Sequence, residues 1–83
     1  MRLLCFAWVK EKTGIAAEDV ALPVDVTTVS ELMGWLVTRG PEFADAFART
    51  DVVRAAIDQT HVRHDARLAG AREIAFFPPL TGG

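Results

Sequence analysis

The chain closes with Glu73-Ile74-Ala75-Phe76-Phe77-Pro78-Pro79-Leu80-Thr81-Gly82-Gly83. This closing stretch predicts a buried strand that ends near Phe77, because proline has no N–H with which to continue a sheet ladder. The strand alternates between an inward side with Ile74 and Phe76 and an outward side with Glu73, Ala75 and Phe77. Two consecutive prolines favour an extended, polyproline-like segment. Residues 78–83 are therefore expected to form a flexible tail that reaches roughly 20 Å beyond the strand.

The tail ends in Gly82 and Gly83, which have no side chains and can enter a channel too narrow for other residues. One interpretation is a frayed end without a role, because chain termini are usually disordered and tolerant of change. The stiff diproline and the aromatic strand before it favour a second interpretation. In that interpretation, the domain delivers its own terminal carboxylate into other proteins.

Composition limits the remaining function classes. A chain of 83 residues is expected to form one domain, residues 1–83, and 51% apolar with 24% charged residues favours a folded globule over disorder. The net charge of −2 provides no basic footprint for nucleic acid or an anionic membrane. No glycine-rich phosphate loop is present, so any ATP chemistry must come from a partner. No segment is long enough to span a bilayer, and a single cysteine fits a reducing compartment, so a cytoplasmic location is expected.

The first strand is predicted at residues 2–9. Its alternation places Leu4, Phe6 and Trp8 on the face that Arg2 marks as outward. One alternative is a strand buried on both faces; the other is a partner-binding patch on the outward face. Cys5 falls on the inward face, where a thiol usually acts as an inert small hydrophobe.

A second strand is predicted at residues 18–24, after a turn at residues 10–15 with Gly14 as the breaker. Pro23 favours an edge position for this strand, because an edge tolerates the missing N–H. The first two strands would then form a hairpin-like pair.

A capping box, Thr28-Val29-Ser30-Glu31, predicts where a helix begins. One face of this helix is apolar at the spacing i, i+3, i+4 and i+7, and its residues are Val29, Leu32, Met33 and Leu36. Gly40 is expected to end the helix and Pro41 to begin the next. That second helix, residues 42–49, would bury Phe43 and Phe47.

A third strand is predicted at residues 52–58, with Val53, Ala55 and Ile57 inward, followed by a turn and a short ribbon at residues 61–63. The element order is then β-β-α-(α)-β-β. It predicts an α+β fold of the β-grasp, ubiquitin-like type, in which helices cover one face of a mixed sheet and the first and last strands are central neighbours. Leu4, Phe6, Ala75 and Phe77 would share the uncovered face beside the tail.

Side chains with catalytic or metal-binding chemistry are sparse. His61 and His64 form an H-x-x-H spacing with only Asp65 nearby as a third ligand, and a solvated turn is the favoured interpretation. No metal, cofactor or self-contained enzyme site is predicted. A terminal carboxylate, in contrast, becomes reactive once a partner adenylates it. Sulfide would then displace AMP to leave a thiocarboxylate, whereas an amine would give an isopeptide.

Three stretches resemble the small subunits of molybdopterin synthase, and the likeness extends over essentially the whole chain. They are Phe6-Ala7-Trp8-Val9-Lys10-Glu11 followed by Gly14, Ala55-Ala56-Ile57-Asp58-Gln59-Thr60, and Glu73 to Gly83. The specific part is Phe-Phe-Pro-Pro-x-Thr-Gly-Gly, since generic ubiquitin-like carriers share only the diglycine. The chain departs from the family at Asp58, where asparagine is frequent, and at Gly70-Ala71-Arg72-Glu73, which replaces a Gly-Asp-Glu turn.

The resemblance implies a β-grasp sulfur carrier that binds no cofactor itself and works in a heterotetrameric synthase. The Gly83 carboxylate would be adenylated with ATP by an E1-like activating enzyme and converted to a thiocarboxylate with sulfur from a donor protein. The tail would then enter the large synthase subunit, which holds the catalytic side chains, and sulfur would pass to cyclic pyranopterin monophosphate. Gly82 and Gly83 are the expected transfer site, and the expected partner-binding residues are Leu4, Phe6, Phe77, Pro78, Pro79, Leu80 and Thr81.

Other functions with the same terminal chemistry stay open at this point. They are a sulfur carrier for thiamine, tungsten cofactor or tRNA thiolation, and a ubiquitin-like modifier that is conjugated to lysines. A binding module with an incidental tail is the least favoured.

Overall fold

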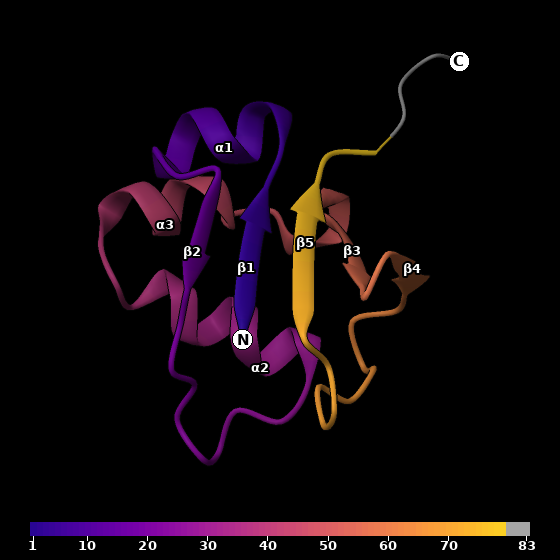
Figure 1. Ribbon diagram of the computed structural model, residues 1–83. Helices are drawn as coiled ribbons and strands as arrows, with labels where there is room; N and C mark the ends of the chain where they lie inside the picture. The colour runs from indigo at the N-terminus through magenta and orange to yellow at the C-terminus, as the bar shows by residue number, and fades with distance from the viewer. Residues whose placement is uncertain (80–83) are drawn as a thin grey trace.

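The computed structural model describes residues 1–79 (Figure 1). Its strands are β1 (Arg2–Cys5), β2 (Ala17–Asp19), β3 (Arg54–Ile57), β4 (Thr60–Val62) and β5 (Glu73–Phe77). Its helices are α1 (Ala7–Thr13), α2 (Val29–Val37) and α3 (Pro41–Ala46), with a short 3-10 helix at Thr50–Val52. Within this part of the chain, no helix has the length and apolar content needed to cross a membrane.

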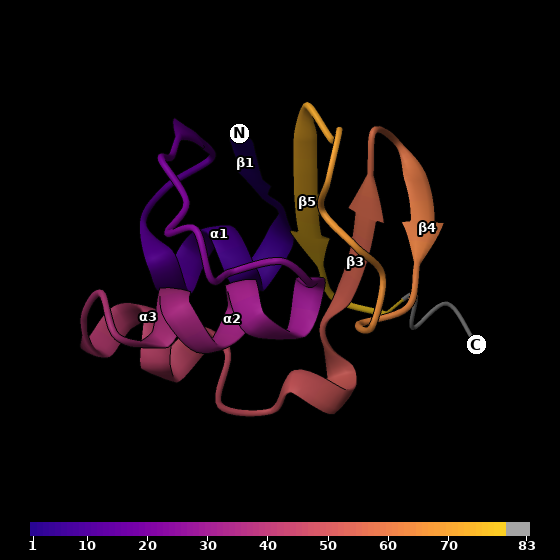
Figure 2. The same ribbon diagram turned by 90° about the horizontal axis from the view of Figure 1, so that it is seen from below.

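The five strands form one mixed sheet in the order β2-β1-β5-β3-β4. The first and last strands, β1 and β5, are parallel neighbours at its centre, and the other pairs are antiparallel. All three helices lie on one side of this sheet (Figure 2). The predicted β-grasp fold is therefore confirmed, including the central pairing of the first and last strands.

Helix α2 begins as its capping box predicts. The Thr28 hydroxyl accepts a hydrogen bond from the Glu31 N–H at 3.2 Å, and the Glu31 carboxylate accepts one from the Thr28 N–H at 3.1 Å. The same carboxylate also accepts from the Thr27 hydroxyl at 2.7 Å, and this bond is the main cause of the lowered pKa of Glu31. The Thr27 N–H donates to this carboxylate as well, at 2.8 Å, so one exposed carboxylate accepts from three donors at the start of the helix.

The apolar face of α2 packs on the covered side of the sheet and forms the core. All four predicted stripe residues are buried, together with the inward residues of β1 and β5, namely Val29, Leu32, Met33, Leu36, Leu3, Cys5, Ile74 and Phe76. Phe43 and Phe47 are buried as well, and the Phe47 ring meets the Phe76 ring edge-on at 5.1 Å between centroids. Such T-shaped contacts stabilise beyond the area that they bury.

The predicted strand over residues 2–9 is wrong beyond Cys5, because residues 7–13 form helix α1. Val9 and Thr13, four residues apart, are buried on one face of this helix. Gly14 then ends the helix in the left-handed conformation, with φ of 79°, and its N–H donates to the Lys10 carbonyl. The residues read as a turn at 10–15 are therefore the last turn and cap of a helix.

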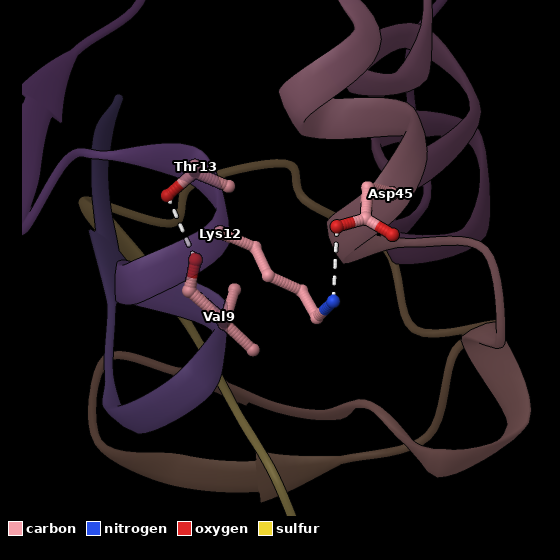
Figure 3. Close-up of polar contacts among 4 residues, drawn as sticks. All are labelled: Val9, Lys12, Thr13 and Asp45. Carbon is pink, nitrogen blue, oxygen red and sulfur yellow. Dashed lines mark hydrogen bonds and ion pairs between the residues drawn. The ribbon is translucent and has the colours of Figure 1, made fainter.

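Helix α1 also changes the position of Trp8. The indole is only half exposed and packs against the core instead of lying on the outward face of a strand. Thr13 is buried but satisfied, because its hydroxyl donates to the Val9 carbonyl at 2.8 Å (Figure 3). On the exposed side, Lys12 pairs with Asp45 of α3 at 2.9 Å and joins the two helices (Figure 3).

Several predicted boundaries also shift. The second strand lies at an edge as predicted but stops at Asp19, four residues before Pro23. Gly40 caps the start of α3 and not the end of α2, whose C-cap is Thr38. Residues 50–52 are a 3-10 turn, so the third strand begins only at Arg54. The ends of the strands depend on the neighbouring strands with which they pair, and local β-propensity alone does not specify them.

Candidate functional site

The tail leaves the sheet at the end of its central strand. β5 pairs with β1 on one side and with β3 on the other, and it ends at Phe77 as predicted. Pro78 and Pro79 follow and are half-buried. The predicted site residues Leu80, Thr81, Gly82 and Gly83 lie outside the described residues. The structure therefore gives the base of the tail, and the transfer site stays a prediction.

The helices leave one face of the sheet uncovered (Figure 1). The strand alternation assigns three of the predicted partner-binding residues to this face, because the inward positions Leu3, Cys5, Ile74 and Phe76 are buried under the helices. Leu4 pairs with Ala75 across β1 and β5, and Phe77 lies two residues further along the same face of β5. Phe6 continues the ladder beyond β1, because its extended backbone donates from its N–H to the Phe76 carbonyl at 3.1 Å. Leu4 and Phe77 are half-buried and Phe6 is 49% exposed. We call these three residues, Leu4, Phe6 and Phe77, the outer face.

The outer face gives the molecule an apolar surface directly beside the tail. Phe6 is one of two large hydrophobic side chains exposed among residues 1–79. An apolar surface of this kind marks a contact with another molecule when it adjoins a functional segment. Whether Leu4, Phe6 and Phe77 bind a partner remains a prediction that the geometry permits.

Sequence reasoning missed a group of basic side chains that lie next to Phe77 on the side of strands β3 and β4. Arg54, His61 and Arg63 line a pocket of about 510 Å³ together with Phe77 and Pro79. The His61 ring lies 5.1 Å from the Phe77 ring at 57°. A signal was present, because a two-residue turn at Asp58 and Gln59 places residue 54 opposite residue 63 in a hairpin.

The two histidines of the H-x-x-H spacing have different surroundings. The His61 ring contacts the Phe77 ring in a tilted arrangement, whereas the Nε2 atom of His64 lies 2.8 Å from the Val53 carbonyl oxygen. Residues 1–79 contain no cluster of three side chains suited to hold a metal ion. His64 therefore has a structural hydrogen bond, and His61 belongs to the pocket beside the tail.

Asp58 anchors the β3–β4 turn to the start of β5. Its carboxylate oxygen accepts from the backbone N–H groups of Arg72 and Glu73, both at 3.0 Å. Its own N–H donates to the Glu73 carbonyl. An asparagine side-chain oxygen has the same acceptor capacity, so the departure at Asp58 preserves this junction. Asp58 therefore positions the start of β5 and, through this strand, the point where the tail begins.

Cys5 is the remaining chemically reactive group of the described core. It lies on the inward face of β1 and is 1% exposed. Burial raises the pKa of its thiol, which disfavours the nucleophilic thiolate. The residue is a core hydrophobe, as the sequence suggested.

Comparisons with known proteins identify the family of the chain. The profile of the ThiS family matches residues 3–83. The chain is 37% identical over 83 residues to the molybdopterin synthase sulfur carrier subunit of Escherichia coli K12, and 32% identical to that of Haemophilus influenzae. In both cases the match covers 100% of this chain and 99% of the relative.

Two solved structures share the fold. SAMP1 from Haloferax volcanii matches with a TM-score of 0.71 at 23% identity, covering 99% of this chain and 97% of that one. A putative molybdopterin converting factor, subunit 1, from Pyrococcus furiosus matches with a TM-score of 0.72 at 22% identity, covering 95% of each chain.

Proposed function

Because the chain belongs to the ThiS family, we propose that it is the sulfur carrier subunit of a molybdopterin synthase. The observation that carries the proposal is the identity of 37% and 32%, over the whole chain, with two relatives that have this name. The sequence Phe-Phe-Pro-Pro-Leu-Thr-Gly-Gly, which begins with the last two residues of the central strand β5, is the feature through which the chain would work. Its large synthase subunit is the implied partner.

The proposed chemistry takes place at the Gly83 carboxylate. A carboxylate oxygen attacks the α-phosphorus of ATP in an E1-like activating enzyme, forming the acyl adenylate and releasing pyrophosphate. Sulfide released by a donor protein then displaces AMP, and the carbonyl carbon keeps one oxygen and gains sulfur. In the large subunit, this thiocarboxylate sulfur attacks cyclic pyranopterin monophosphate and forms a thioester, and water then cleaves the acyl C–S bond, which leaves sulfur on the pterin and regenerates the Gly83 carboxylate. The carrier supplies the nucleophile and the partners supply the catalytic side chains.

The position of the tail supports this role. β5 is hydrogen-bonded on both sides, so the point at which Pro78 begins is held by the centre of the sheet. Two prolines reduce the number of conformations that the emerging chain can adopt. A rigid base and a stiff spacer lower the entropy lost when the terminal glycines enter a narrow channel.

We further propose that the outer face docks the large subunit and, at a different step, the activating enzyme. Both partners must receive the same terminal carboxylate, so both must approach the same end of β5. A shared docking face makes the two complexes mutually exclusive. A cytoplasmic location fits the buried, unpaired thiol of Cys5.

The experiment that tests the proposed function is the intact mass of the protein after incubation with ATP, a sulfur source and the activating enzyme. We expect one oxygen of the terminal carboxylate to be replaced by sulfur, and we expect the product to transfer sulfur in the presence of the large subunit. A chain that instead becomes linked to lysines of other proteins would identify a modifier. A chain that stays unmodified would contradict the sulfur-carrier proposal.

Replacement of Phe77 by alanine should weaken binding to the large subunit at least about tenfold, because an aromatic anchor near an interface centre contributes about 2 kcal/mol or more. Affinity is measured by titration calorimetry with the wild type and Phe77→Ala. Val24→Ala is the matched control, because Val24 is 98% exposed and lies outside the outer face. Thermal melts of the isolated chain establish that both variants fold. Equal affinities for wild type and Phe77→Ala would show that Phe77 has only a structural role.

A further inference from the structure

The pocket beside the tail has a charge opposite to that of the whole chain. The net charge is −2, yet Arg54, His61 and Arg63 line this pocket and no described acidic residue does. None of the ion pairs within residues 1–79 includes Arg54. Arg63 has one long contact, 3.9 Å to Asp65, and its side chain is 92% exposed. Both guanidinium groups therefore remain available to another molecule.

These two arginines lie next to each other where the β3–β4 ladder ends. Ala55 pairs with Val62 as the last pair of this antiparallel ladder, Arg54 precedes Ala55 in β3, and Arg63 directly follows β4. Like charges at directly opposed positions destabilise a sheet. Among residues 1–79, the long Arg63–Asp65 contact at 3.9 Å is the one ion pair that offsets this repulsion, and an anion between the two guanidinium groups would offset it further.

The pocket is also continuous with the outer face. Arg54 pairs with Phe77 on β5, and Phe77 and Pro79 line the pocket together with the basic residues. Any protein that receives the tail must therefore sit against this pocket. The apolar wall of Phe77 and Pro79 excludes water when it is covered, and an ion pair strengthens as the local dielectric falls.

We propose that Arg54 and Arg63, with His61 beside them, form a basic rim that binds aspartate or glutamate side chains of the large subunit next to the point where the tail enters. This inference rests on the proposed function and names the chemistry of the surface that the partner presents. Charges at the rim of an interface mainly steer association and set its dependence on salt. The rim therefore orients the carrier, and the outer face supplies most of the binding energy.

The test is the affinity and association rate of Arg54→Glu, Arg63→Glu and the double variant with the large subunit. We expect the double variant to bind at least about tenfold more weakly, mainly through slower association. The difference should shrink between about 0.05 M and about 0.5 M salt, because screening shortens the range of the interaction. Arg67→Glu is the matched control. Arg67 is exposed, and its backbone forms an isolated β-bridge with Thr28 at the start of α2. The substitution Arg67→Glu therefore makes the same charge change at a position away from the rim.

A second arm identifies the partner group. Lysine substitutions of acidic residues on the large subunit should restore binding to the charge-reversed carrier and weaken binding to the wild type. Wild-type affinity and salt dependence in the double variant, with Phe77→Ala still impaired, would overturn this inference alone. Unchanged protein affinity combined with chemical-shift changes at Arg54 and Arg63 on adding inorganic phosphate would overturn it in favour of a small-anion site. A wild-type chain that does not bind the large subunit would overturn both this inference and the proposed function.

Discussion

Deletion of Gly83 is expected to abolish formation of the pterin product. Loss of one residue shortens the tail by about 3.3–3.6 Å, and a misplacement of reacting groups by about 1 Å already lowers a rate about 100-fold. A one-residue extension should be equally damaging, because an amide then occupies the former place of the carboxylate. Replacement of Gly82 by valine adds a branched side chain and should hinder entry into a channel built for glycine.

The measurement compares wild type, the deletion, the extension and Gly82→Val in an assay with activating enzyme, large subunit and pterin precursor. Intact mass reports the thiocarboxylate, and product yield reports transfer, so the two steps are separated. Urea melts should be unchanged, since every buried core residue among those described lies at or before Phe76. Full thiocarboxylate formation and full yield from the deleted or extended chain would refute the carrier mechanism.

Replacement of Leu36 by alanine should lower the free energy of unfolding by about 2–5 kcal/mol. Leu36 is 0% exposed and belongs to the apolar face of α2 that covers the sheet. The loss combines the transfer free energy of the removed atoms with the cavity that remains. For a chain of 83 residues this is a large part of the total stability.

The loss is measured as the shift of the urea midpoint at constant slope. Val24→Ala is the control, because a substitution at a 98% exposed side chain usually changes stability by less than about 0.5 kcal/mol. If Leu36→Ala and Val24→Ala melt alike, the α2 face does not form the core. Loss of binding to partners without loss of stability would likewise place Leu36 at the surface.

The beginning of α1 shows where reading the chain locally failed. Leu3 to Val9 is a continuous apolar run, and such a run fits a strand buried on both faces as well as the start of a helix. Ala7 adopts a positive φ of 52° where the strand gives way to the helix, a conformation uncommon for alanine. No cap residue of the preferred type marks this start, so Phe6 stands at the N-cap without a side-chain bond.

Features encoded within about ten residues could be read from the sequence alone. The capping box at Thr28, the stripe from Val29 to Leu36, the end of β5 before Pro78 and the inward side of the strands all follow from local spacing and from the chemistry of single residues. The element order then predicted the β-grasp arrangement. The predicted role of Gly82 and Gly83 also came from the sequence, because two consecutive glycines after a diproline can be recognised without tertiary context.

The tertiary structure decided which side chains gather around Phe77 and Pro79 at the base of the tail. Arg54 lies in β3, His61 in β4 and Arg63 directly after β4, and a two-residue turn sets the register of this hairpin. Phe77 joins them through the pairing of β5 with β3. A shift of one residue in either register would send these side chains to the other face of the sheet. Long-range pairing, and not local propensity, therefore placed a basic pocket beside an apolar face at the base of the tail.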